Sequence, residues 1–143
     1  MNVLIDTNVM LDILLQREPH CRDAAKVNVL AEKKHIRSYI SASAVTDIFY
    51  IAKKELKDTG KATELLKNIL KTTRIASVTE NCIYEALDLK WNDFEDSVQY
   101  VAGKNILADY IITRNANDFA NSRIKAISPT EFLEIYGEAE NEP

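Results

Sequence analysis

The sequence predicts an α/β fold, in which a mostly parallel sheet is covered by helices on both faces. Short apolar segments alternate with longer amphipathic ones along the chain, and this alternation is typical of parallel strands joined by crossover helices. The 143 residues suffice for one domain with its own core. Only three glycines and three prolines are present, so few turns of special geometry are available and helices should dominate.

Five short apolar runs are the predicted strands. They are rich in Ile, Val and Tyr, which strands favour, and the first run ends on a carboxylate in "NVLID". The predicted strands occupy residues 2–6, 37–41, 74–78, 109–113 and 124–127. A polar turn, "RNANDF", separates the last two.

Helices are predicted between these strands, and several carry start or stop signals. The helix after the first strand breaks at "REPH", and a second helix covers about 20–34. Ser41 or Ser43 is placed to cap the third helix, which Gly60 should end before another amphipathic helix begins. Thr79 is a candidate cap for the helix that follows.

The later helices are marked in the same way. The segment "DFEDSVQYVAGKN" is a predicted helix before the fourth strand. Ser128 and Pro129 then suit the cap and the first position of a final helix, because proline at that position needs no donor.

Cysteine usage and apolar content predict a cytoplasmic protein. Cys21 and Cys82 stand outside any CxxC or Cys/His spacing, so we interpret them as small buried side chains in a reducing compartment. Asp6 and Asp12 interrupt the first apolar stretch, which argues against a signal peptide. No apolar run approaches the roughly 20 residues that span a bilayer. The net charge of −4 excludes coating of nucleic acid by bulk charge but allows a local basic groove.

Four segments each place an acid where the carboxyl ends of the strands should meet. Asp6 ends the first strand, and Asp47 lies early in the helix after the second. Asp96 opens the helix before the fourth strand, and Asp118 follows that strand. In open parallel sheets, ligands bind at this edge. The four acids are therefore predicted to share a site.

Carboxylates gathered in this way require a neutralising partner. Two unit charges about 4 Å apart repel by on the order of 4 kcal/mol at an effective dielectric constant of 20. No lysine lies beside Asp6, Asp47 or Asp96 in the sequence. A carboxylate-rich, histidine-poor site suits Mg²⁺ or Mn²⁺. Such an ion can activate a bound water and stabilise charge on a phosphate.

Four segments in order resemble the successive motifs of the PIN domain family: "VLIDTNVMLDILL", "ISASAVTDIFYIAKK", "DFEDSVQYVA" and "ADYIITRNANDF". PIN domains are metal-dependent nucleases, and the small bacterial ones are often VapC-type toxins. The resemblance runs from residue 1 to about 133. It implies a three-layer α/β/α sandwich, with one nuclease domain over 1–136 that holds Mg²⁺ or Mn²⁺. The acidic segment 137–143 is expected to be disordered.

The resemblance also implies roles for the acids. Asp6, Asp47 and Asp96 match the three core acids that hold the metal, although the family usually has Glu where Asp47 stands. The fourth acid often follows "TR" directly, but here that position is Asn115, and Asp118 lies three residues further on. The fourth group is therefore Asp118, Asn115 through its amide, or absent.

Polar residues near the motifs have functional and structural interpretations. Asn8 either contacts substrate or caps a helix, and Arg114 is a candidate for binding RNA beside Asn115. Asp93 is expected to cap the helix that carries Asp96. Asp12 is expected to face solvent or to form a local ion pair.

Other side chains are expected to be structural. Phe119 is predicted to lie in the core, and Tyr50 and Trp91 are interpreted as packing residues. Lys53 and Lys54 are candidates to flank an RNA groove, but scattered basic residues of this kind are more often part of a solvated face, and we interpret them so.

The leading hypothesis is a metal-dependent endoribonuclease that cuts single-stranded or looped RNA. If it is a toxin, an antitoxin should block its cleft, and a homodimer is the usual form. A phosphatase of the haloacid dehalogenase type also begins with a strand that ends on Asp, but it needs a second Asp where this chain has Asn8. A degenerate domain that binds RNA or protein without cutting is the other alternative, and Asn115 favours it.

Overall fold

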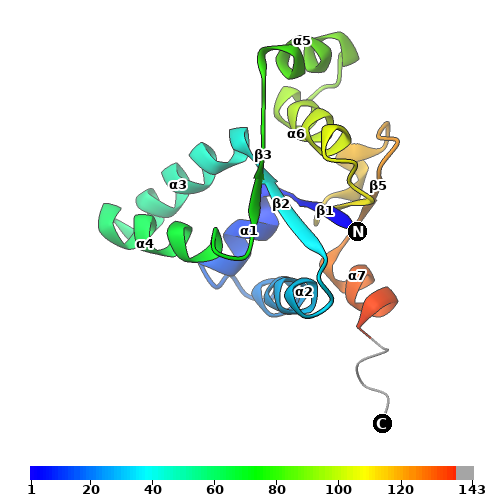
Figure 1. Cartoon of the computed structure of the whole chain (residues 1–143). Helices are drawn as coiled ribbons and strands as arrows, with labels where there is room; N and C mark the ends of the chain where they lie inside the picture. The colour runs from blue at the N-terminus through cyan, green and yellow to red at the C-terminus, as the bar shows by residue number, and fades with distance from the viewer. Residues whose placement is uncertain (138–143) are drawn as a thin grey trace.

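The computed structural model describes residues 1–137, which form a sheet of five strands between two layers of helices (Figure 1). The strands are β1 (Asn2–Ile5), β2 (Arg37–Ser41), β3 (Arg74–Ala76), β4 (Tyr110–Ile112) and β5 (Lys125–Ile127). Their order is β3-β2-β1-β4-β5, and every neighbouring pair is parallel. The predicted α/β/α sandwich is confirmed. Several strands are one or two residues shorter than predicted.

Within the described chain, seven α-helices and one 3-10 helix, η1, connect the strands. They are α1 (Thr7–Leu14), α2 (Cys21–Lys33), α3 (Ala42–Leu56), α4 (Thr59–Ile69), α5 (Glu80–Leu89), α6 (Phe94–Asn105), η1 (Ala116–Phe119) and α7 (Pro129–Tyr136). Of the two predicted caps for α3, Ser41 is the one that accepts from the helix. Thr79 caps α5, and Ser128 caps α7 with Pro129 at the first helical position, as predicted.

The prediction that Gly60 ends α3 is wrong. The helix ends earlier, and Lys57 follows it in the left-handed conformation with a φ of 56°. Asp58 then begins α4, because its Oδ1 accepts from the amide of Lys61 at 3.1 Å. Gly60 lies inside α4. A left-handed residue and a carboxylate cap turn the chain here without a glycine.

The central strand β1 has a core on each of its faces, because side chains alternate along a strand. Val3 and Ile5 pack with α1, α2, α3 and α7, whereas Leu4 packs on the face that α6 covers. In Figure 1, α5 and α6 lie on this second side of the sheet. Phe119 belongs to the second core, as predicted. Trp91 stacks on Tyr100 with ring centroids 5.0 Å apart, which confirms its packing role.

The parallel arrangement brings the carboxyl ends of all strands to one edge of the sheet. Asp6 follows β1 directly and therefore lies at this edge, between the ends of β2 and β4. None of the described helices is both long and apolar enough to cross a membrane. The disorder predicted for 137–143 concerns, beyond Gly137, residues outside the described part of the chain.

Candidate active site

Asp6 is a buried carboxylate held by hydrogen bonds from two other elements. Its backbone amide donates to the carbonyl of Ile112 at 2.9 Å, which extends the pairing of β1 with β4. Thr113, the residue after β4, donates from Oγ1 to Asp6 Oδ2 at 2.8 Å. Gln99 on α6 donates from Nε2 to Asp6 Oδ1 at 3.0 Å. The carboxylate is 6% exposed, so these two donors orient it.

An open cleft of about 430 Å³ lies at this edge of the sheet. It brings together all four predicted catalytic acids and Asn8, which come from separate segments. Its lining residues are Asp6, Thr7, Asn8, Asp47, Tyr50, Ile51, Asp93, Glu95, Asp96, Gln99 and Asp118. The site is therefore built between the N-terminal parts of α1, α3 and α6, with η1 at its border.

The pKa of Asp96 reflects its burial and the repulsion between the acids of this cleft. Asp93 caps α6, and its Oδ1 accepts from the backbone amide of Asp96 at 3.1 Å, as predicted. Burial raises the pKa of the Asp96 carboxyl to about 7, together with the negative charges of Asp93, Asp6 and Asp118. The cleft therefore concentrates more negative charge than its own residues neutralise.

The donor set of the cleft suits a hard, hydrated cation. All its charged groups are carboxylates, and Gln99 Oε1 beside Asp6 is a buried oxygen with no hydrogen-bond partner. Among the described residues, however, no three His, Cys, Asp or Glu side chains lie close enough to hold one ion. Mg²⁺ typically keeps several waters and uses one or two carboxylates. The acids therefore fit a partly hydrated ion rather than an all-protein cage.

Outside the cleft, the partly exposed Arg114 forms an ion pair with the buried Asp12. Arg114 Nε lies 2.8 Å from Asp12 Oδ2, and its Nη2 donates to Oδ1 at 3.3 Å. Asp12 is completely buried, so the expectation of solvent exposure or a local ion pair is wrong. Its partner is 102 residues away in the sequence. The pairing of β1 with β4 brings the two segments together.

Asn115 does not line the cleft. Its side chain is exposed, and its backbone amide donates to Thr113 Oγ1 at 3.0 Å. Because Thr113 in turn donates to Asp6, this turn helps to hold the Asp6 carboxylate in place. Asp118 on η1, and not Asn115, lies among the acids.

Sequence reasoning missed three residues of the site. Gln99 lies three positions after Asp96, which places both on one face of α6. Thr113 ends its strand as Asp6 ends β1, a signal that sequence reasoning could have used. Tyr50 was interpreted as a packing residue, but it is 66% exposed and lines the cleft three positions after Asp47.

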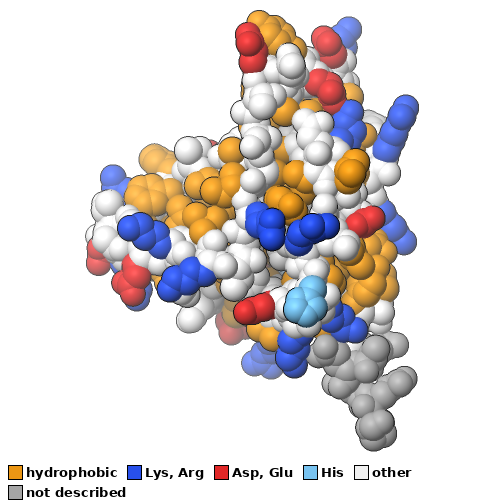
Figure 2. Space-filling model, viewed as in Figure 1, with side chains coloured by type: hydrophobic (Ala, Val, Ile, Leu, Met, Phe, Trp, Pro, Cys, Tyr) orange, Lys and Arg blue, Asp and Glu red, His pale blue; other side chains and the backbone are white. Residues whose placement is uncertain are grey.

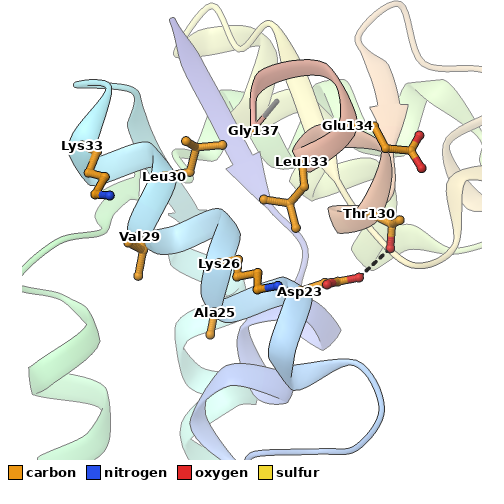
Figure 3. Close-up of a pocket in the computed structure, with 10 residues that line it drawn as sticks. All are labelled: Asp23, Ala25, Lys26, Val29, Leu30, Lys33, Thr130, Leu133, Glu134 and Gly137. Carbon is orange, nitrogen blue, oxygen red and sulfur yellow. Dashed lines mark hydrogen bonds between the residues drawn. The ribbon is translucent and has the colours of Figure 1, made fainter. Parts of the chain in front are cut away.

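A larger cavity lies elsewhere, between α2 and α7 (Figure 3). Its volume is about 590 Å³, and its wall contains Val29, Leu30 and Leu133. Asp23 accepts a hydrogen bond from Thr130 there at 2.8 Å. None of the predicted site residues lines this cavity, and we assign it no part in the chemistry of the acids.

The sequence matches the family model of the PIN domain over residues 2–117. The chain belongs to the PIN domain family. This match includes Asp6, Asp47 and Asp96, whose side chains line the cleft. No curated protein matches this PIN domain in sequence.

Solved structures share the fold of this PIN domain. A toxin–antitoxin complex from Klebsiella pneumoniae matches with a TM-score of 0.66 and 19% identity, covering 89% of this chain and 97% of that one. VapBC2 from Rickettsia felis, bound to a promoter DNA fragment, matches at 0.70 with 14% identity over 90% and 98%. VapC20 from Mycobacterium tuberculosis, a toxin that cleaves the sarcin-ricin loop, matches at 0.68 with 12% identity over 83% and 94%. At these identities the likeness extends to the fold of this PIN domain alone.

Proposed function

We propose that this PIN domain is a metal-dependent endoribonuclease that cleaves single-stranded or looped RNA. The observation that carries the proposal is the cleft itself, where Asp6, Asp47, Asp96 and Asp118 converge from four segments. Carboxylates serve phosphodiester hydrolysis by holding a divalent ion, and PIN domains are nucleases as a family.

Asp6, Asp47 and Asp96 are the residues that would hold Mg²⁺ or Mn²⁺, in part through waters that the ion retains. When bound, the ion would activate a water and stabilise negative charge on the phosphate. Gln99 and Thr113 fix the Asp6 carboxylate before any ligand arrives, which lowers the cost of ordering the site.

RNA and an antitoxin are the proposed partners. Unpaired RNA can place its backbone in an open cleft, whereas a duplex holds its backbone rigidly. Asn8 in the cleft is the nearest candidate for a substrate contact, while Arg114 and Asn115 would contact RNA only beyond the cleft lining. Because similar folds occur in the toxin–antitoxin complex and in VapBC2, we also propose an antitoxin that covers the cleft, and a homodimer in its absence.

The test is cleavage of a mixed single-stranded RNA pool by wild type, Asp6→Asn and Asp96→Asn with Mn²⁺ or Mg²⁺. We expect cleavage that needs metal, stops with chelator and falls by at least about 100-fold in both variants. Asp88→Asn is the matched control, because Asp88 is exposed on α5 and lies outside the cleft lining. Activity that survives both site substitutions would come from a contaminant and would contradict the proposal.

A second candidate is a domain that binds RNA or protein without cutting. It is favoured by Asn115 at a position where the family often has an acid, and by the spacing of the acids, of which no three in the described chain can share an ion as they stand. A folded wild type that binds RNA but leaves it intact with every divalent ion would establish this second function.

A further inference from the structure

A second hollow adjoins the acidic cleft along α3. It has a volume of about 450 Å³ and is lined by Tyr50, Lys53, Lys54, Lys57, Asp58 and Thr59. Tyr50 lines both hollows, so the two form one continuous surface. One hollow is acidic and the other is predominantly basic.

Helical spacing explains this continuity. Asp47, Tyr50 and Lys54 follow one another at steps of three and four residues, which lie on one face of a helix, and Lys57 follows directly after the end of α3. At 1.5 Å per residue, Lys54 lies about 10 Å along the helix axis from Asp47. We call Lys53, Lys54 and Lys57 the lysine ridge. The ridge extends the site away from the acids by more than the length of one phosphodiester unit.

The lysine ridge shares its hollow with one acid, Asp58, but forms no ion pair with it. None of its three ammonium groups forms an ion pair in the described part of the chain. Asp58 is occupied as the cap of α4, and Glu55 on the same helix pairs with Arg17 at 2.6 Å. The lysines near the end of α3 also complement the helix dipole, but the dipole does not account for the exposed aromatic ring of Tyr50 beside them.

Because the molecule as a whole is negatively charged, a local basic surface such as the lysine ridge matters for RNA binding. The net charge is −4, and the face seen in Figure 2 mixes basic and acidic side chains. General attraction to RNA is therefore absent, and a polyanion needs a local basic surface near the cleft. An exposed aromatic ring next to lysines is the combination that binds single strands, in which bases stack and phosphates pair with ammonium groups.

We propose that the lysine ridge and Tyr50 form a binding site for single-stranded RNA beside the acidic cleft. The ridge holds phosphates of the nucleotides that flank the scissile bond, and Tyr50 stacks on a base at the border of the two hollows. The choice of RNA as the ligand rests on the proposed nuclease function. The assignment adds that the RNA strand enters the cleft from the side of the lysine ridge.

The experiment measures binding separately from cleavage. Fluorescence anisotropy with a labelled single-stranded RNA of about 12 nucleotides is recorded for the full chain in chelator, so that the probe stays intact. We expect the Lys53→Gln/Lys54→Gln/Lys57→Gln variant to bind at least about tenfold more weakly, and the slope of log K against log salt to fall by about 2, as expected for three lost contacts to a single strand.

Tyr50 is tested by its conservative variant. Tyr50→Ala should weaken binding by about tenfold with an unchanged salt slope, and Tyr50→Phe should retain it, because stacking needs only the ring. Lys34→Gln is the control for the loss of a single lysine away from the ridge. Lys34 precedes β2 and so lies at the opposite edge of the sheet from the cleft. It should change neither quantity.

Three results would overturn the assignment. The first is unchanged RNA affinity in the triple variant, with its fold verified by circular dichroism. The second is equal loss in Lys34→Gln. The third is an acidic peptide that competes with RNA at equal concentration, since the ridge would then be a protein-docking surface. A second assay separates the two proposals. If the wild type cleaves RNA in Mn²⁺ but the ridge variants bind RNA normally, the binding site is refuted and the nuclease function stands. If binding depends on the ridge but no cleavage occurs, the nuclease function is refuted and the binding site stands.

Discussion

The surroundings of Asp6 explain why the first apolar strand is followed by a carboxylate. The residue is almost fully buried, and such a position is costly for a charge unless donors surround it. Gln99 and Thr113 supply two donors, but both are neutral. The carboxylate is therefore oriented without being neutralised, which is the condition that a cation site requires.

Asp96 predicts the pH dependence of the metal-free protein. Its pKa is raised to about 7 by burial and by neighbouring carboxylates, against about 3.9 in an unfolded chain. Between about pH 4 and pH 7, Asp96 therefore carries a proton in the folded state but not in the unfolded state. The contribution of Asp96 to stability is present below about pH 4 and is lost as the pH rises to 7. We expect Asp96→Asn to be more stable than wild type at pH 8 by on the order of 1 kcal/mol, because partial exposure screens the repulsion.

Urea denaturation at pH 8 and pH 5 without metal measures this difference, which should shrink at the lower pH. An advantage of Asp96→Asn that is equal at both pH values would contradict the titration of Asp96. Metal-dependent cleavage should follow the opposite trend and fall as the pH is lowered, because protons compete with the ion for the carboxyl group.

Arg114 is predicted to stabilise the fold through Asp12. The carboxylate is completely buried and accepts from Arg114 at two atoms. Removal of one partner of such a pair leaves an uncompensated charge. We expect Arg114→Ala to lower the free energy of unfolding by about 3 kcal/mol, measured by urea denaturation. Arg123→Ala, an exposed arginine in the loop before β5, should change it by less than about 0.5 kcal/mol.

At the scale of elements, α3 and α6 build the cleft. Each begins at a capped N-terminus near the carboxyl edge of the sheet and carries its acid early, Asp47 on α3 and Asp96 on α6. The caps therefore set where the two acids lie. In α3 the same face continues through Tyr50 to the lysine ridge, so one helix contributes to both catalysis and RNA binding in the proposed function.

Ser41 is predicted to control the position of α3. Its buried Oγ accepts from the amide of Ala44 at 3.2 Å. Ser41→Ala leaves that amide unpaired and should destabilise the protein by about 1–2 kcal/mol. Thermal unfolding measures the loss, and Ser77→Ala, at an exposed loop position, is the control. A loss no larger than that of the control would show that α3 does not depend on this cap.

At the scale of the molecule, the sheet order decides what the acids can do. β1 is central, and β2 and β4 flank it. The segments that follow β2 and β4 therefore begin on either side of Asp6, which follows β1. The excess negative charge of this edge is a property of the assembled fold, and it predicts that metal binding will stabilise the whole domain.

Metal should raise the melting temperature through the cleft acids. At an ion concentration of about 100 times Kd, binding adds about 2.7 kcal/mol, which for a domain of this size corresponds to roughly 10 °C. Differential scanning fluorimetry with Mn²⁺ should show this increase for wild type and Asp88→Asn and lose it for Asp6→Asn. An equal increase in all three proteins would place the ion outside the cleft.

Most of the elements and the candidate acids could be predicted from local signals in the chain. Periodicity and caps located the strands and most helix starts, because these signals are local, as at Thr79 and Ser128. The position of Asp6 after a strand, and of its three partners in the helices and the turn near strand ends, predicted that these acids share one edge. Gly60 was the exception, since a left-handed Lys57 and a cap at Asp58 can end and restart a helix without glycine.

How the side chains meet depends on the assembled sheet and could not be predicted in this way. Strand order and register are set by packing between distant segments, and they bring Thr113 and Gln99 to Asp6 and Arg114 to Asp12. The exposure of Tyr50 depends in the same way on which face of α3 the core covers. Contacts between residues about 100 positions apart leave no periodic signal in one sequence, so the oriented carboxylate and the ion pair of the buried Asp12 emerge only when the sheet is assembled.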